Sequence, residues 1–437
     1  MKIYPIKLRN ILAFTGLLLA LMQAVDVTAQ AESPYSRFGL GTLRSPVFSS
    51  NQAMGFLAAP YASAININSA NPASYASLTR TTLEIGTLID GRAINTGDSV
   101  YKAGAGGVSH FAIAFVPNPK HNNWAITLGL SPYSNVDYNF IQNFDDSING
   151  QYSQAYKGSG SLYQVFAGGA YKVNGFSIGA NLGYLFGKLE YQKIIALPDS
   201  LYGLSTRNIN NVNVNGFNYT VGVQYQKLLY HNHDEQDNRH DINMYIGAYG
   251  SGGIKLRTKS SNYWDRFYYD TYNALQVLDT LESTFNVKGK INLPFNIGAG
   301  MMFGNETFWL AGFDFKYANW SSYTTPLDNG GLNDSWQLSF GAQITPKLGD
   351  KGYLNNMQYR FGGYYGQSEI LFNGHSFTQG GATIGFGLPF KNIAHLNLTG
   401  DFGSLSTPDR NIIRESYYRF TIGLVLNDIW FIKQKFD

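Results

Sequence analysis

Cysteine is absent from this 437-residue chain, and charged residues make up only 14% of it. Without disulfides, an exported chain of this size must take its stability from its own hydrogen-bonded fold. Beyond residue 31, no apolar run reaches the roughly 18 residues that a bilayer-spanning helix needs. The formal net charge is +3, and it falls to +1 when the first 31 residues leave with three cations and one anion. That balance excludes the basic footprint of a nucleic-acid-binding protein.

The first 31 residues have the organisation of a secretory signal peptide. A positively charged start precedes the mostly apolar stretch 11–25, and Ala29 and Ala31 form a small-residue cleavage site before Glu32. An uncleaved anchoring helix is the alternative, but the apolar stretch is short for a membrane span. We therefore expect export, with cleavage after residue 31.

Alternation of apolar with small or polar residues recurs from about Thr81 to the C-terminus. Successive side chains of a strand point to opposite faces, so each such segment has one apolar and one polar face. One example is the apolar series Phe176, Ile178, Ala180, Leu182, Tyr184 and Phe186. Behind a secretory signal, this pattern predicts an all-β fold: a transmembrane antiparallel β-barrel of about 14 strands, with outer-membrane lipid outside and polar groups inside.

The connections between the expected strands alternate in length. Every second connection is short, and the longer ones are expected at 141–157, 190–210, 259–284 and 404–414. Outer-membrane barrels have short periplasmic turns and longer external loops, so both ends of the barrel should lie in the periplasm. A secreted sandwich or propeller is the alternative architecture. It is disfavoured because the strands are long and no repeat of about 40 residues is visible.

Residues 32–80 differ from the rest of the chain. They are rich in Ser, Ala, Asn and Pro and lack sustained alternation. We therefore expect three parts: a signal peptide (residues 1–31), a compact N-terminal segment (32–80) and an outer-membrane barrel (81–437).

The motifs of this N-terminal segment resemble those of the FadL-type family of outer-membrane transporters. They are Ala-Met-Gly at 53–55, a run of small residues at 62–68 and Asn-Pro-Ala-Ser-Tyr at 71–75. Phe56 stands where the family often has glycine. The opening 33–41 and the ending 427–433 are similar to Bacteroidetes members. The resemblance implies a 14-stranded barrel plugged by an N-terminal hatch, which carries hydrophobic compounds such as long-chain fatty acids.

Two candidate elements of a transport path follow from this resemblance. Asn71, Pro72 and Ala73 are either a moving hatch gate or a fixed corner, since Asn-Pro favours a tight turn. Pro132 interrupts the third expected strand, where proline cannot donate to a ladder. In the resembling family, a kink in the third strand opens a lateral gap to the bilayer. Pro132 is therefore a candidate lateral opening, although the strand could also have left the membrane there.

An external hydrophobic loop is expected at 259–284. Its apolar residues recur at spacings of three and four, which indicates one face of a short helix. They are Trp264, Phe267, Tyr268, Tyr272, Leu275 and Leu278. This helix would either receive hydrophobic cargo or pack onto the barrel rim.

Motifs that suggest enzymatic or metal chemistry have simpler interpretations. The His- and Asp-rich stretch 231–240 fits no standard metal loop and is expected in a solvated turn. Gly175-Phe176-Ser177-Ile178-Gly179 matches a nucleophile signature that requires a strand–turn–helix elbow, but it lies within an alternating strand. We expect no enzymatic activity, no cofactor and no metal.

The sequence therefore predicts passive uptake of hydrophobic, fatty-acid-like molecules across the outer membrane, through a hatch and a lateral opening. A non-transporting barrel subunit of an outer-membrane secretion or assembly complex, with outer-membrane or periplasmic protein partners, is the alternative; a polar-solute porin is a third. The expected inward charges could bind a carboxylate head group or pair with one another across the lumen. They are Arg360, Arg419, Lys188 and Asp401.

Overall fold

A computed structural model describes residues 33–430, except 98, 118–122, 147–149, 197–204, 232–240, 270–273, 328–330, 350, 391–392 and 410–411. The predicted signal peptide lies outside the described residues. The strands of the wall are β2 (Thr81–Asn95), β3 (Val100–Phe115), β4 (Trp124–Asp146), β5 (Gly150–Val173), β6 (Phe176–Ala196), β7 (Ser205–Tyr230), β8 (Ile242–Ser251), β9 (Ile254–Tyr269), β10 (Leu275–Leu293), β11 (Asn296–Asn305), β12 (Trp309–Ala318), β13 (Ser335–Ile344), β14 (Gln358–Phe372), β15 (His375–Phe390), β16 (Ala394–Ser406) and β17 (Arg414–Asp428).

The other elements are short. They are η1 (Pro34–Arg37), β1 (Thr42–Leu43), α2 (Ser49–Gln52), η2 (Pro72–Ser77), η4 (Trp320–Ser322) and η5 (Tyr353–Asn356). No helix among the described residues is long and apolar enough to cross a bilayer.

The wall is a closed antiparallel barrel of fourteen strands, as the alternation predicts. Neighbouring strands pair in sequence order, and β17 pairs with β2 from Asp428↔Thr81 to Arg414↔Asn95, which closes the ring. Two of the fourteen strands are interrupted. Both β8 and β9 pair with β7, while β11 pairs with β8 and β10 pairs with β9. The breaks fall at residues 252–253 and 294–295, where Pro294 cannot donate to a ladder.

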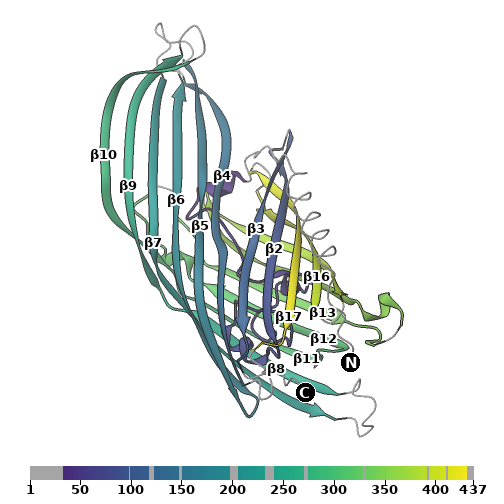
Figure 1. Cartoon of the computed structure of the whole chain (residues 1–437). Coiled ribbons are helices and arrows are strands. Elements are labelled where there is room, and N and C mark those ends of the chain that lie inside the picture. The colour runs from purple at the N-terminus through teal and green to yellow at the C-terminus, as the bar shows by residue number, and fades with distance from the viewer. Residues whose placement is uncertain are drawn as a thin grey trace, which may run out of the picture.

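Six strands extend far beyond the rest of the barrel at the end opposite Thr81 and Asp428 (Figure 1). We call this sheet the wing; it comprises 134–146 of β4, 150–161 of β5, 188–196 of β6, 205–215 of β7, β9 and β10. The predicted loops 141–157, 190–210 and 259–284 are wrong over most of their length, because strand pairing continues through them. Alternation of apolar with polar residues is less regular here, because many outward positions of the wing carry polar or charged side chains, such as Asn213, Lys259 and Lys288.

The predicted helix within 259–284 is also wrong. Trp264, Phe267 and Tyr268 lie in β9, and Leu275 and Leu278 lie in β10. Within β10 the spacing of three and four falls on register shifts, which interrupt its pairing with β9 at three places, whereas on β9 Trp264 and Phe267 simply fall on opposite faces of a regular strand. Each bulge changes the face on which the following apolar residue falls, so a β-strand imitates a helical period. Tyr272 lies outside the described residues.

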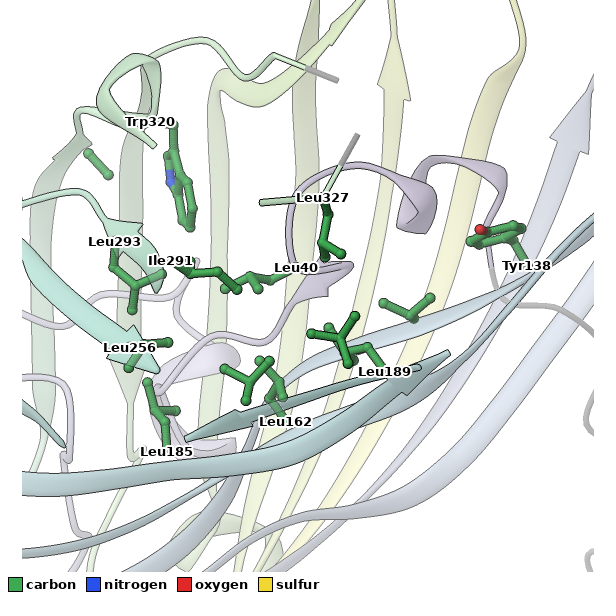
Figure 2. Close-up of a cluster of buried hydrophobic side chains, with 14 of the residues drawn as sticks. Leu40, Tyr138, Leu162, Leu185, Leu189, Leu256, Ile291, Leu293, Trp320 and Leu327 are labelled. Carbon is green, nitrogen blue, oxygen red and sulfur yellow. The ribbon is translucent and has the colours of Figure 1, made fainter. Parts of the chain in front are cut away.

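The concave face of the wing packs around an apolar cluster (Figure 2). Leu162, Leu185, Leu189, Val212, Val214, Leu256 and Ile291 of the wing strands are at most 1% exposed. Leu40 from the N-terminal region and Trp320 and Leu327 from the β12–β13 connection cover them (Figure 2). Each fully buried aliphatic side chain contributes about 1.5–3 kcal/mol relative to an exposed one. This end of the lumen is thus closed by a packed core.

Around the lower barrel, large apolar side chains point outward. We call this band the apolar belt; it includes Ile89, Ile126, Ile178, Phe217, Ile297, Phe313, Phe340, Ile384 and Phe420, which are 44–66% exposed. A lipid-facing band of this kind is the expected outer surface of a membrane barrel.

Candidate functional site: a plugged lumen and an interrupted wall

Residues 44–78, which we call the luminal segment, fill the interior of the barrel. Most of their side chains are buried, although the segment has only a short α-helix and one longer 3-10 helix. Its backbone amides would be unsatisfied in a dry lumen, which is costly. The inner faces of the wall strands supply the missing partners.

Three wall carboxylates accept hydrogen bonds from the luminal segment. Asp314 of β12 accepts from the backbone amides of Ala58 and Ala59, with N···Oδ2 distances of 3.0 and 2.5 Å. Glu306, beside β12, accepts from Ser63 Oγ and Ala64 N at 2.6 and 2.8 Å. On the opposite wall, Glu84 of β2 accepts from Ile67 N at 3.1 Å. Hydrogen bonds to charged acceptors are among the stronger ones, so the segment is fixed at three separate points.

Uncharged wall side chains complete this attachment. Thr383 of β15 accepts from Gly55 N and donates to Ala53 O, while Thr399 of β16 donates to Ser49 O. Gln224 of β7 donates to the carbonyls of Ala59 and Tyr61. The lumen is therefore filled by a segment that seven or more strands hold from all sides, rather than by a mobile loop.

The candidate gate residues form a capped corner. Asn71 precedes η2, and its Oδ1 accepts from Ala73 N at 3.2 Å, while its Nδ2 donates to Ala59 O at 2.7 Å. Pro72 occupies the first helical position, where its fixed φ and missing N–H are tolerated. Asn71 and Ala73 are completely buried. In this structure the three residues form a fixed corner; a gating role stays a prediction.

Close approach between the luminal segment and the wall requires glycine in the strands. A Cβ atom on Gly341 of β13 would lie 2.2 Å from Met54 O, and one on Gly247 of β8 would lie 1.8 Å from Ala59 O. Both obstructing atoms belong to the backbone, which cannot rotate away. Phe56 has a left-handed φ of +66°, which explains why the FadL-type pattern often has glycine there. Its ring packs edge-on against Tyr364, with centroids 5.2 Å apart.

Charges inside the barrel pair with one another. Asp90 lies 3.0 Å from Arg44 and 3.2 Å from Arg92, and Arg419 lies 3.4 Å from Asp401. Arg360 is only 2% exposed and donates to the side-chain oxygens of Gln343, Asn397 and Gln358. The expected inward position of Lys188 is wrong. Its side chain is 57% exposed and lies 3.6 Å from Glu190 on the outer face, because it has the same parity as outward-facing Phe186.

The wall is interrupted between β3 and β4. Their pairing runs only from Phe115↔Ile126 to Phe111↔Leu130, although β3 continues to Val100 and β4 to Asp146. On the other side of β4, pairing with β5 continues, with a register shift between Pro132 and Ser134. Pro132 thus lies two residues beyond the last β3 partner, at a bulge that turns β4 away. Ile89 of β2 faces outward at the level of Gly106 of β3, so the interruption begins within the apolar belt.

Residues 33–43, which we call the edge segment, occupy the free edge of β4. Ser33 N donates to Asp137 O at 3.1 Å, and Ser36 Oγ exchanges hydrogen bonds with the Asp137 backbone. Further along, β1 pairs with β4 through Thr42↔Asn135 and Leu43↔Ser134. The edge segment therefore takes part of the place that β3 leaves, from the luminal side.

A cavity of about 330 Å³ lies between the luminal segment, the edge segment and the wall. Its lining combines apolar and charged side chains and reaches Ser131, Pro132 and Tyr133 on β4, Asp314, Lys316 and Glu369 on the opposite wall, and Arg419 on β17. A second cavity of about 430 Å³ separates Lys102 and Ala103 of β3 from Asp137–Asn139 of β4, with Pro34 in its lining. The interruption therefore has open space on both sides of the edge segment.

The expected external apolar residues have different surroundings. Trp264 is half-buried, Phe267 is 1% exposed and Tyr268 is 39% exposed. Near them, Arg266 donates from Nε to Asp279 at 2.9 Å, and this hydrogen bond lowers the pKa of the Asp279 carboxyl. Of the 231–240 stretch only His231 is described; it contacts Asp241. Among the described residues, no cluster of three or more His, Asp or Glu could hold a metal.

Sequence reasoning missed the carboxylates that attach the luminal segment. Glu84 lies at an inward position of β2, and Asp314 lies among the aromatic residues of β12. A charge in each of these segments was a usable signal. The partner amides, however, lie more than 240 residues away for Asp314 and Glu306, and no local pattern identifies them.

Comparison with known proteins places this geometry in context. The family model of BamG matches residues 9–437, so the matching family is BamG rather than the FadL-type family that the motifs resemble. No curated protein sequence matches the chain. Several solved structures have the same fold, at identities that establish the fold alone.

A Pseudomonas aeruginosa FadL homologue has a TM-score of 0.58 at 12% identity, with 89% of this chain and 99% of that chain covered. The monoaromatic hydrocarbon channel CymD has a TM-score of 0.53 at 15% identity, covering 90% and 100% of the two chains. The toluene transporter TodX of P. putida has a TM-score of 0.52 at 15% identity, covering 88% and 99%. The barrel is thus of the outer-membrane type, and its FadL-type likeness is one of architecture.

Proposed function

This chain belongs to the BamG family, and we propose that it is an outer-membrane channel for hydrophobic small molecules that pass between the lumen and the bilayer. The observation that carries this proposal is the interrupted wall between β3 and β4 at the level of the apolar belt. A continuous barrel forces a molecule through the whole lumen. An interrupted one provides a sideways exit into lipid.

The luminal cavity defines the path in this proposal. It reaches Pro132 and Tyr133 beside the interruption, and the edge segment separates it from the space between β3 and β4. Cargo leaves when the edge segment withdraws from β4, while the luminal segment stays attached through Asp314, Glu306 and Glu84. The charged part of the lining suits an amphipathic molecule with a polar head, which a fatty-acid-like compound has.

The function is tested by uptake into liposomes that contain the purified barrel. We expect a fluorescent long-chain fatty acid and a small aromatic hydrocarbon to enter faster than into protein-free liposomes. A sugar of similar size should enter at the protein-free rate, because the polar route is filled. Uptake of neither hydrophobic probe would contradict the proposal, and rapid uptake of the sugar would indicate a porin instead.

A second candidate function is a non-transporting subunit of an outer-membrane protein complex. The free edge of the wing favours it. Over residues 275–291, β10 has a ladder partner only in β9 among the described residues. Leu278, Leu281 and Phe285 are omitted from that ladder at the register shifts and are 52–60% exposed. Exposed apolar side chains along an extracellular sheet edge suit a protein partner, since isolated edges favour aggregation.

Substitution of this edge tests the second candidate. Leu278→Ser with Leu281→Ser and Phe285→Ser should remove any protein that co-purifies from native membranes with the unaltered chain, because the shared apolar surface is lost. A matched control is Val100→Ser with Tyr101→Ser and Ile141→Ser, whose parent side chains are 59–65% exposed elsewhere. Partner recovery that is unchanged by the β10 triple variant, or absent from the unaltered chain, would exclude this edge as a partner site.

A further inference from the structure

Five basic side chains gather on the outer face of the wing. They are Lys255, Arg257 and Lys259 on β9 and Lys288 and Lys290 on β10, and we call them the cationic cluster. All five are exposed, whereas Leu256 and Thr258 between them are buried. Because successive strand residues face opposite sides, the cluster lies on the side away from the apolar core of the wing.

The strand register places these like charges directly opposite one another. Lys259 pairs with Lys288, and Arg257 pairs with Lys290. Directly opposed side chains have Cβ atoms about 4.5–5.5 Å apart, and like charges at such positions destabilise a sheet. None of the five has a salt bridge among the described residues; the nearby acid Glu190 contacts Lys188 instead. The cluster therefore lacks an internal counterion.

The neighbouring strand supplies hydrogen-bond donors on the same face. Asn213 of β7 pairs with Lys259 on one side and with Lys188 of β6 on the other, and Asn215 pairs with Arg257. Lys188, Asn213, Lys259 and Lys288 thus form one row of ammonium and amide groups across four strands, at a strand spacing of about 4.8 Å. Such a surface can bind several anionic oxygens at once.

The cluster lies immediately above the apolar belt. On β7 the outward series continues from Asn215 to Phe217 and Tyr219, which are 66% and 47% exposed. Along the chain from β10 to β11, Lys290 is followed by Phe295 and Ile297, which are 43% and 50% exposed. Two residues of a strand span about 6.6 Å. The distance from the cations to the apolar side chains is therefore comparable to the thickness of a lipid head group.

We propose that the cationic cluster binds the phosphate groups of a phosphorylated outer-leaflet glycolipid, whose acyl chains lie along Phe217, Tyr219, Phe295 and Ile297. The lipid is favoured over a soluble phosphate because the apolar strip continues directly beneath the charges on the same face. Charge-assisted hydrogen bonds to phosphate offset the repulsion between the opposed cations. The site is independent of the lumen and of the β3–β4 interruption.

Lipid binding at this site is tested by counting the lipid molecules that the barrel retains. The barrel is reconstituted in phosphatidylethanolamine nanodiscs that contain bisphosphorylated lipid A, and retained lipid is counted by native mass spectrometry. We expect Lys259→Gln with Lys288→Gln and Lys290→Gln to lower lipid A retention by at least about tenfold. The control Lys227→Gln with Lys347→Gln and Lys351→Gln removes the same charge from exposed positions near the opposite turns and should retain lipid A normally.

Two further samples separate the sources of anion. Dephosphorylated lipid A should be retained poorly by the unaltered barrel, and inorganic phosphate alone should leave its thermal unfolding unchanged. Equal retention by the cluster variant and the control would overturn the proposal. Stabilisation by inorganic phosphate without lipid retention would assign the cluster to a soluble anion and overturn the lipid assignment. A heat-dependent shift in electrophoretic mobility verifies that every variant is folded.

Discussion

Locking the edge segment to β4 with a disulfide should abolish uptake of hydrophobic probes. In Leu43→Cys with Ser134→Cys, the two residues are direct cross-strand partners. Arg44 N donates to Tyr133 O, so residues 44 and 133 form a hydrogen-bonded pair, and 43 with 134 form the adjacent non-hydrogen-bonded pair. Such pairs have Cα atoms about 4.5 Å apart, which suits a disulfide.

The expected size of this effect is large because the lock removes the open state altogether. Oxidised protein should take up fatty acid at least about tenfold more slowly than reduced protein in the same liposomes. The chain contains no cysteine, so no other disulfide competes. Ser404→Cys with Ser416→Cys joins the paired strands β16 and β17 and provides a matched control. Full uptake by the oxidised 43–134 variant would mean that cargo does not pass the edge segment.

A single wall substitution should displace the luminal segment. Gly341→Val places a branched side chain where even its first carbon would lie 2.2 Å from Met54 O. Overpacking against side chains costs about 1–3 kcal/mol, and a backbone obstacle leaves less room to relax. We expect residues 44–78 to become sensitive to proteinase K and the barrel to conduct ions in planar bilayers, whereas the unaltered protein does neither.

Controls distinguish displacement of the segment from general misfolding. Gly107→Val, where an added Cβ would meet nothing within 4 Å, should stay protease-resistant and non-conducting. Gly247→Val, opposed by Ala59 O, should repeat the Gly341→Val result from another strand. If both variants fold with the luminal segment still protected, the segment is not held by the close contacts described above.

The barrel could be predicted from sequence because its pattern is local. Phe176 to Phe186 alternate on one strand, and the lipid outside imposes that alternation. The wing escaped prediction because many outward positions of its strands carry polar or charged side chains, so these strands lack a regular apolar alternation. Bulges at Leu278, Leu281 and Phe285 further disguise β10 as part of a helix. Short connections such as 174–175 were recognisable because a turn requires particular residues, with Asn174 and Gly175 both at positive φ.

The candidate site was predictable only in part. Pro132 marks a disturbance in β4 by its chemistry alone, but the end of the β3–β4 pairing depends on the edge segment, which lies about 90 residues earlier in the chain. Likewise, the apolar positions of β6 change from even-numbered (Phe186) to odd-numbered (Leu189) at Gly187, so the sequence alone does not indicate which side Lys188 faces. Lys259 and Lys288 become a pair only through a register that no short window contains.

The attachments of the luminal segment also determine when the protein can become native. Gly55 is joined to Thr383 across 328 positions, and Ser49 to Thr399 across 350. Contacts of such sequence separation form slowly, because the chain entropy of a very long loop is lost before they stabilise anything. The N-terminal residues of the exported chain therefore reach their native positions only after the last strands have formed. Ring closure between β17 and β2 and seating of the segment amount to one late, cooperative step of assembly.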